Sequence, residues 1–255
     1  ADHVFVCAGP TQTPALLRRS GIKYHVGDTL RIHPMLKVGA RFPEAIDAHK
    51  SVLPLLQVKE FWPELSIGGA FFSAGHLAML LSENWTRTSH VMSDLRRFGT
   101  WYVAVKGNGR GSVRPSFFGE GSPVIRYELS DEDLRQLSRG LARLASLLLA
   151  AGASEVYPSV QGMPVIDSRV DAVRWLDDLL PRSAVSLTTV HAFSSCPVGE
   201  RKDRCAADSY GRVFGFDGLN INDASMLPDS PGVNPQGTIM ALARRNALRF
   251  AADHG

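Results

Sequence analysis

The sequence is poor in cysteine and has no long run of apolar residues. It has three cysteines, Cys7, Cys196 and Cys205. A count that is both small and odd argues against a disulfide framework. This favours a reducing compartment, so we expect a cytoplasmic protein. Cys7 lies in an apolar run and is expected to be buried, whereas a pairing of Cys196 with Cys205 stays open. Because no run reaches the roughly 18 apolar residues that cross a bilayer, no transmembrane segment is expected.

Clustered basic charge and several familiar catalytic motifs are also missing. The net charge is only +3, and the one dense basic group, residues 201–204, is interrupted by Asp203. We interpret that group as a solvated loop, so no nucleic-acid partner is expected. The absence of Gly-x-Ser-x-Gly argues against a hydrolase triad. No spacing of His, Cys and Asp matches a common zinc site, so no metal is expected.

The residues that are present indicate α/β structure at the two ends of the chain. Residues 4–9 read as a buried strand that ends in a glycine turn. A short helix over 14–19 follows, with Thr13 as its cap and Gly21 at its end. The chain begins without Met directly before this apolar run, which we interpret as a protein whose front part lies elsewhere.

The middle of the chain has a different pattern, typical of a mostly antiparallel sheet backed by helices. Short β-rich runs alternate there with Gly, Pro and Ser turns. Ser130 and the acids after it predict a helix start, and leucines at helical spacing continue to Gly152. The predicted strands are 36–41, 101–106, 124–127, 184–189 and 219–222. Two further helices are predicted over 167–180 and 235–254. We therefore expect one domain built from 1–34 and 191–255, and a second from 35–190.

Two polar residues near the C-terminus could carry chemistry. Asn234 precedes Pro235, which suits the first helical position, so Asn234 is expected to cap the last helix. The free N–H groups of that first turn attract anions. His191 follows an apolar strand and precedes a turn of small residues, and its ordinary pKa suits a base near neutral pH. Taken alone, His191 is better explained as a structural histidine and Asn234 as a plain helix cap.

Several segments, taken in order, resemble the glucose–methanol–choline (GMC) family of FAD oxidoreductases. Residues 9–22 resemble the second signature of the family, with Lys23 where a glycine is usual. Residues 26–30 and His33-Pro34 resemble its next block, with Asp28 where Asn is common. Residues 111–114 and 123–125 fit the substrate domain, and 191–244 fit the C-terminal block.

The resemblance implies a fold, an activity and a cofactor. The fold would be mixed α/β: the C-terminal portion of a Rossmann-like FAD domain, plus a substrate domain with a mostly antiparallel sheet. The activity would be the oxidation of an alcohol to a carbonyl by hydride transfer to flavin N5. His191 would be the base, and Asn234 would bind the substrate oxygen. The residues implied beside the FAD are Gly9, Pro10, Asp223, Ala224, Pro235 and Gln236.

The family's Gly-x-Gly-x-x-Gly turn, which holds the FAD pyrophosphate, is absent from this sequence. We therefore expect the chain to need an N-terminal FAD-binding segment or subunit as its partner. Two alternatives remain open. One is a hydroxynitrile lyase, which keeps FAD without net redox chemistry, and the other is a non-catalytic partner subunit.

Overall fold

The computed structural model describes residues 1–52, 56–116 and 121–254, and these divide into two compact units. Unit 1 comprises 1–33, 107–129 and 190–255, and unit 2 comprises 34–106 and 130–189. The division at 33/34 and 189/190 lies close to the expected domain boundaries. Residues 107–129, however, cluster with unit 1, although the sequence assigned them to the middle domain. The mixed α/β class with antiparallel sheets is confirmed.

Unit 2 is built around a single antiparallel sheet. The strand order is β10-β3-β6-β5-β4, and β9 also pairs with β3. The longest pairing joins β3 to β6, in a register that runs from Met35 opposite Ala104 to Arg41 opposite Phe98. The strands are β3 (Met35–Arg41), β4 (Gln57–Val58), β5 (Leu65–Gly69), β6 (Phe98–Val105), β9 (Glu155–Pro158) and β10 (Leu187–Thr188).

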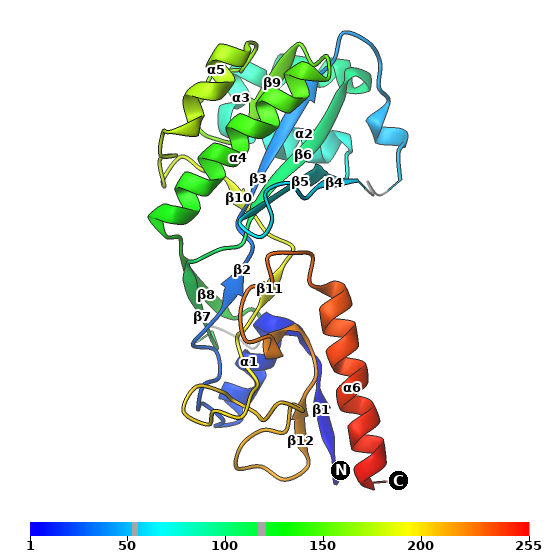
Figure 1. Ribbon diagram of the computed structural model, residues 1–255, viewed down its shortest axis with the longest axis vertical. Coiled ribbons are helices and arrows are strands. Elements are labelled where there is room, and N and C mark those ends of the chain that lie inside the picture. Colours follow the sequence, from blue (N-terminus) through cyan, green and yellow to red (C-terminus); the bar gives the residue numbers. More distant parts are fainter. Residues whose placement is uncertain (53–55, 117–120, 255) are drawn as a thin grey trace. The chain divides into compact units, whose positions relative to one another are not determined.

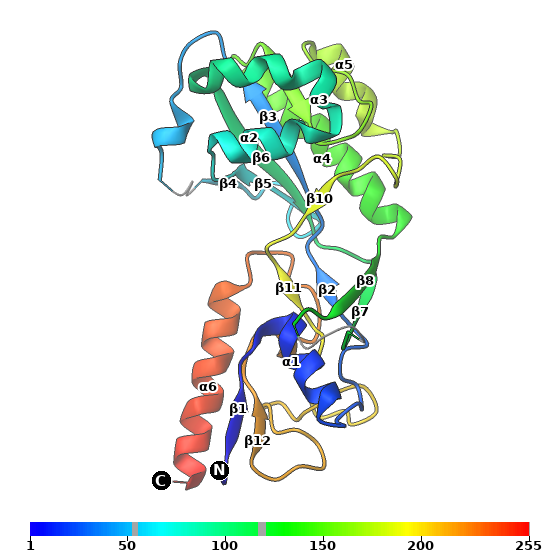
Figure 2. The same ribbon diagram turned by 180° about the vertical axis from the view of Figure 1, so that it is seen from behind.

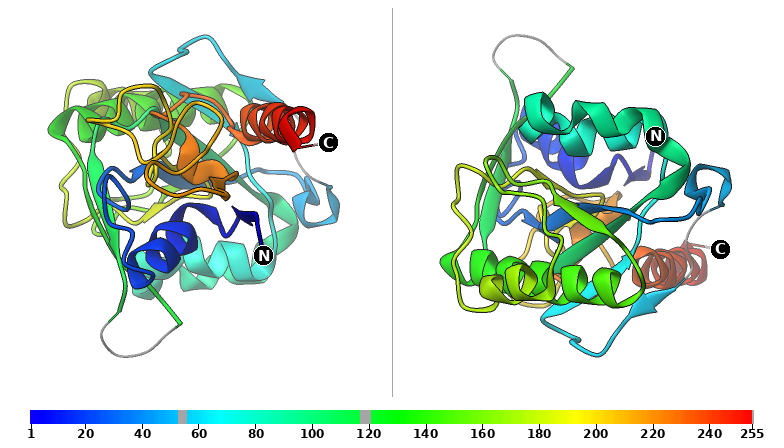
Figure 3. Two further views of the ribbon diagram at one scale, coloured as in Figure 1. Left: turned by 90° about the horizontal axis from the view of Figure 1, so that it is seen from below. Right: turned by 90° about the horizontal axis from the view of Figure 1, so that it is seen from above.

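Helices cover both faces of this sheet (Figures 1 and 3). The long helix α4 lies on one face, and α2 and α3 lie on the other, which Figure 2 shows from behind. The helices are α2 (Ala74–Leu81), α3 (Trp85–Thr88), α4 (Asp131–Ala150) and α5 (Arg169–Val173). Short 3₁₀ turns accompany them: η1 (Ala48–Lys50), η2 (Ser82–Asn84), η3 (Ser89–Arg97) and η4 (Arg174–Leu176).

The leucine stripe of α4 explains why this face closes. Leu137, Leu141 and Leu144 are fully buried and belong to one apolar cluster with Leu36 and Val103 of the sheet. The helix starts as predicted, because the Ser130 side chain accepts from Asp133 N while the Asp133 carboxylate accepts from Ser130 N. On the opposite face a separate cluster packs α2 against Phe98 and Tyr157. Unit 2 therefore buries both faces of its sheet with its own residues.

Unit 1 is built from pairs of short strands. Its strands and helices are β1 (Val4–Val6), α1 (Gly9–Arg19), β2 (Arg31–Ile32), β7 (Arg110–Arg114), β8 (Val124–Glu128), β11 (Ala192–Phe193), β12 (Leu219–Ile221), η5 (Ala224–Met226) and α6 (Gln236–His254). Strands β1 and β12 pair in parallel, whereas β2 with β11 and β7 with β8 pair antiparallel. Helix α6 runs alongside β1 (Figures 1 and 2), where the rings of Phe5 and Phe250 meet edge to face with their centroids 4.9 Å apart.

Three local predictions in the chain differ from the structure. Helix α1 begins at Gly9 rather than at 14, and Thr13 lies inside it because its hydroxyl bonds a distant carboxylate instead of capping. The helix expected over 167–180 is reduced to α5 and the short turn η4. Cys7 is exposed rather than buried, since β1 has a neighbouring strand on one side only among the described residues.

Candidate active site

The parallel pair β1 and β12 brings two strand-to-helix junctions to one edge of unit 1. Parallel strands end on the same side, so the turn after Val6 lies beside the turn after Ile221. In the first turn Gly9 opens α1 with a positive φ of 82°, a conformation that glycine adopts without strain. In open α/β sheets, ligands bind outside the carboxyl ends of the strands. This edge is therefore the place in unit 1 where a cofactor site is expected.

The buried carboxylate of Asp223 ties the two junctions together. Its Oδ2 accepts from Gly9 N at 2.9 Å and from Thr13 Oγ1 at 2.5 Å, and its Oδ1 accepts from Ser225 N at 2.7 Å. Asp223 is 8% exposed. A carboxylate with three donors around it is well satisfied where it lies. The side chain therefore holds the turns in place, and only the backbone nearby is left to meet a ligand.

The segment that follows His191 is fastened to the same junctions. Ser195 Oγ donates to Pro10 O at 2.7 Å, and Cys196 N donates to Ser225 O at 2.9 Å. Ser194 takes a positive φ of 63°, and its hydroxyl donates to Leu227 O at 2.6 Å. Four of the predicted cofactor residues, Gly9, Pro10, Asp223 and Ala224, thus belong to one connected region, to which this segment is bound. The connection was not visible in the sequence, because its partners lie about two hundred residues apart.

His191 stands immediately before β11 and is half-buried. Strand β11 pairs with β2, and the ladder extends by one further bond, from His33 N to His191 O at 3.2 Å. This pairing places the two imidazoles together: their Nδ1 atoms are 3.1 Å apart, and the rings meet edge to face at 89°. In the sequence, His33 stands out only as part of the His33-Pro34 motif. The pairing of β2 with β11 is what brings it to His191, since each histidine lies directly beside one of these short strands.

Asn234, Pro235 and Gln236 lie at the start of the last helix. Helix α6 begins at Gln236, Pro235 is buried, and Asn234 is exposed. This end of α6 lies at the same end of unit 1 as β2 and β11 (Figures 1 and 2). That Asn234 and His191 converge on one substrate atom stays a prediction.

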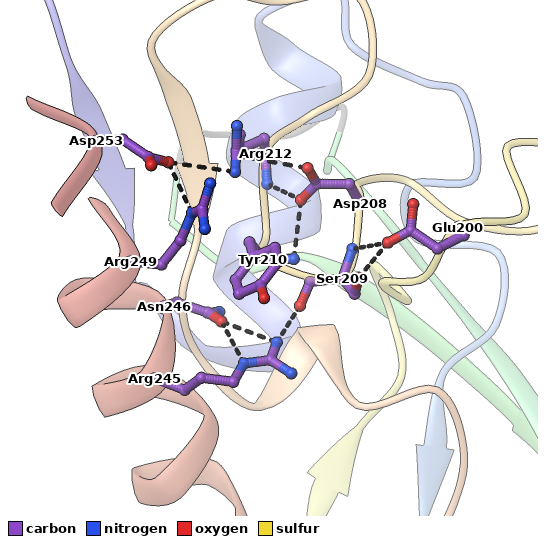
Figure 4. Close-up of polar contacts among 9 residues, drawn as sticks. All are labelled: Glu200, Asp208, Ser209, Tyr210, Arg212, Arg245, Asn246, Arg249 and Asp253. Carbon is purple, nitrogen blue, oxygen red and sulfur yellow. Dashed lines mark hydrogen bonds and ion pairs between the residues drawn. The ribbon is translucent and has the colours of Figure 1, made fainter. Parts of the chain in front are cut away.

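A polar network fixes the other end of α6 to the loop before β12 (Figure 4). Arg245 donates to the buried Asn246 Oδ1 and to the Ser209 carbonyl, and its guanidinium lies over the Tyr210 ring. Arg212 and Arg249 both bond to Asp253. The network borders a hollow of about 430 Å³ that also touches His3 and Gly218. These two residues precede β1 and β12, so the hollow lies at the opposite ends of the strands from the Asp223 junctions.

None of the three cysteines is bonded to another in the structure. All three are free thiols, so the open question of a Cys196–Cys205 bond is answered against pairing. Burial, with the nearby Asp223 charge as a second cause, raises the pKa of Cys196 to about 12. A thiol that stays protonated is a poor nucleophile and metal ligand. Among residues 1–52, 56–116 and 121–254, no group of His, Cys, Asp and Glu could hold a metal ion.

Relatives of this chain are found by sequence and by structure. The family model for GMC oxidoreductase matches residues 108–243. An uncharacterized GMC-type oxidoreductase, y4nJ of Sinorhizobium fredii, is 46% identical over 247 residues, which are 97% of this chain and 49% of that protein. The long-chain-alcohol oxidase FAO4A of Arabidopsis thaliana is 24% identical over 264 residues, 93% of this chain and 35% of the oxidase.

Solved structures share the fold. Pyridoxine 4-oxidase from Mesorbium loti superimposes with a TM-score of 0.67 at 17% identity, covering 100% of this chain and 52% of that one. A mutant formate oxidase of Aspergillus oryzae, studied for FAD modification, gives 0.66 at 16% identity, covering 99% and 54%. The class defined by these matches is a mixed α/β oxidoreductase. The chain belongs to the GMC oxidoreductase family and corresponds to the C-terminal half of its members. It spans about half the length, or less, of the curated relatives it matches.

One further observation concerns membranes. Among the residues that the structure describes, no helix is both long enough and apolar enough to span a bilayer.

Proposed function

We propose that this chain is the catalytic-residue-bearing half of an FAD-dependent enzyme that oxidises an alcohol to a carbonyl compound. The observation that supports this most is the connected region built on Asp223, to which the segment carrying His191 is fastened. The imidazole of His191 thus lies in the same unit as the carboxyl ends of the parallel strands β1 and β12. Membership of an oxidoreductase family supplies the reaction class.

The residues at the Asp223 junctions fit a flavin nucleotide. Apart from the neighbours of Gly9 and the backbone of its own helix, no atom of the described residues lies within 4 Å of the position that a Cβ on Gly9 would take. The first turn therefore has open space before it. Backbone groups of Gly9, Pro10 and Ala224 would border the cofactor, with Pro235 and Gln236 at the first turn of α6. A helix N-terminus favours negative charge, and a reduced flavin carries it. When bound, FAD would supply a hydride acceptor for the carbon that carries the hydroxyl group.

The protein side of the reaction is proton transfer and orientation. His191 would take the hydroxyl proton as the carbon–hydrogen bond breaks, so that the two electrons of that bond leave with the hydride and a carbonyl remains. The Asn234 amide would donate to the substrate oxygen, where negative charge develops. Both groups must meet the same oxygen, because hydride transfer requires a near-attack geometry.

The proposed partner is the N-terminal segment that carries the glycine-rich turn. In β1, Val4 N and Val6 O bond towards β12, which directs the N–H and C=O of Phe5 to the outer edge. In the described part of the chain no strand pairs with that edge. A parallel pair of three-residue strands is marginal alone, and an apolar open edge invites a further strand. We propose that the N-terminal segment supplies it.

The free thiols support the predicted reducing, cytoplasmic setting.

The test is to express the full-length protein, with its N-terminal half, beside the 255-residue chain alone. We expect a flavin absorption spectrum from the full-length protein only. Under anaerobic conditions an alcohol substrate should bleach that flavin, because no acceptor reoxidises it. A hydroxynitrile lyase would release cyanide from a cyanohydrin without bleaching. A flavin that neither bleaches nor supports cyanide release with a broad panel of substrates would favour a non-catalytic subunit and contradict the proposal.

A further inference from the structure

The contact between His191 and His33 carries an inference that rests on the proposed function and deepens it. We propose that His33 is the positioning residue of the base. In this arrangement His33 Nδ1 accepts the Nδ1–H of His191 and thereby fixes His191 Nε2 as the nitrogen that takes the substrate proton.

The geometry of the pair restricts how its protons can be arranged. Two ring nitrogens 3.1 Å apart are at hydrogen-bond distance, so one of them carries a proton and the other accepts it. A neutral imidazole has one N–H and one bare nitrogen. If His33 donated, His191 Nδ1 would be the acceptor and the only proton of His191 would sit on Nε2. That tautomer has no basic Nε2, so it could not remove a proton there. Base chemistry at Nε2 therefore requires His191 to donate.

The surroundings of His33 hold its ring in one place. The residue is 3% exposed, and its backbone N–H is bound to His191 O at 3.2 Å. Its ring meets Phe193, which is fully buried, edge to face at a centroid distance of 4.9 Å. A residue anchored by the strand ladder and by a buried aromatic ring presents its Nδ1 in a fixed direction. This is the role that an orienting group plays for a catalytic histidine, filled here by a neutral imidazole rather than a carboxylate.

The same contact links the charge of the two rings. When His191 takes the substrate proton it becomes an imidazolium, and its bond to His33 becomes charge-assisted and stronger. Two imidazolium rings in this geometry would set N–H against N–H, so the contact is a hydrogen bond only while one of the two Nδ1 atoms is bare. If His33 is the ring that carries the Nδ1 proton, His33 is the donor and His191 has no basic Nε2.

The charged groups nearest along these strands are already paired with each other. Arg31, two residues before His33 on the same strand, lies 3.3 Å from the Asp229 carboxylate. The Arg31 guanidinium also donates to the carbonyls of Asn108 and Gly109. The positive charge of Arg31 therefore has a carboxylate partner of its own and does not depend on the imidazoles for one.

The experiment uses the full-length holoenzyme and two substitutions of unlike chemistry. His33→Leu fills the space without an acceptor, whereas His33→Asn keeps an oxygen near the place of Nδ1. We expect kcat to fall by about 10- to 100-fold in His33→Leu, as for other partners that orient a functional histidine, with KM and flavin content kept. His33→Asn should recover most of that loss. A kcat unchanged in His33→Leu would overturn the proposal.

A measurement on the unsubstituted protein does not depend on either variant folding. In enzyme labelled with ¹⁵N-histidine, assigned by His191→Ala, the nitrogen shifts should show His191 protonated at Nδ1 and bare at Nε2. In His33→Leu the balance should move towards Nε2–H. A His191 that carries its proton on Nε2 in the unsubstituted enzyme would overturn the inference. If His191→Ala itself left turnover intact, the proposed function would fail, whereas a severe His191→Ala with an unaffected His33→Leu would defeat this inference alone.

Discussion

The two units of this chain solve the problem of burying a sheet in different ways. Unit 2 covers both faces of a six-stranded antiparallel sheet with its own helices. Unit 1 has only two-stranded sheets, and its parallel pair leaves the outer edge of β1 open in the described part of the chain. The unit with the more complete core contains none of the proposed catalytic residues. The polar contacts around the Asp223 junctions all belong to unit 1.

This difference suggests a division of labour that experiments can sharpen. Substitutions in unit 2 should act on stability through packing and helix capping. Substitutions in unit 1 should act on turnover or on the junctions that border the cofactor.

The largest expected effect is on turnover in unit 1. In the full-length enzyme, His191→Ala removes the proposed base, so turnover should fall by about 10²- to 10⁴-fold while the flavin stays bound. Asn234→Ala should lower turnover less. The matched control is His90→Ala, which changes an exposed histidine of unit 2 and should leave steady-state rates unchanged. Equal rates for His191→Ala and His90→Ala would place the chemistry elsewhere.

The next effect concerns the Asp223 carboxylate, which bonds to both strand-to-helix junctions. Asp223→Ala leaves the donors Gly9 N, Thr13 Oγ1 and Ser225 N without their acceptor. We expect a loss of about 3 kcal/mol in the stability of unit 1 and reduced flavin content in the full-length protein. Urea unfolding and the ratio of flavin to protein absorbance measure these. The exposed Asp217, which precedes the same strand, gives the control Asp217→Ala, and an equally small effect from both would show that the Asp223 bonds are unimportant.

A smaller effect tests the packing of unit 2. A Cβ on Gly140 of α4 would lie 2.3 Å from Val103 Cγ1, so Gly140→Ala should destabilise by about 1–3 kcal/mol although alanine favours helix. Adding Val103→Ala removes the atom it strikes. The double variant should therefore be more stable than the sum of the two single losses, which urea titration can measure. Simple additivity would mean that α4 and β6 do not approach this closely.

The smallest effect is at the start of the same helix. Ser130→Ala removes one half of the capping box and should cost about 1 kcal/mol in the unfolding of unit 2. Ser130→Asp keeps an acceptor at the cap and should cost less. Turnover of the full-length enzyme should stay the same in both, and a change in turnover without a change in stability would contradict the division between the units.

The sequence predicted elements best where the local signal and the tertiary structure agree. The capping box at Ser130 and the leucine spacing define α4 by themselves, and the β-rich runs at 36–41 and 101–106 predict β3 and β6. Prediction failed where a distant group competes with a local one. Thr13 is a good cap by type, but the buried Asp223 carboxylate takes its hydroxyl, so α1 starts earlier.

The candidate site was predicted in part for the same reason. His191 and Asn234 could be named from their positions beside a strand and a helix, and from the resemblance to a family. His33 could not be named in this way, because its proposed role depends on the pairing of β2 with β11, two strands about 160 residues apart in the chain. The prediction that Cys7 is buried was wrong, because an apolar strand predicts burial but does not identify the residues that cover it.

We propose that the N-terminal half completes the sheet of unit 1, whereas unit 2 buries both faces of its sheet with its own residues. The decisive measurement is hydrogen exchange at the amides of Phe5 and Cys7, compared between the 255-residue chain and the full-length protein. We expect fast exchange at both amides in the chain alone and strong protection in the full-length protein, with α4 equally protected in both. Equal exchange at Phe5 and Cys7 in the two proteins would contradict it.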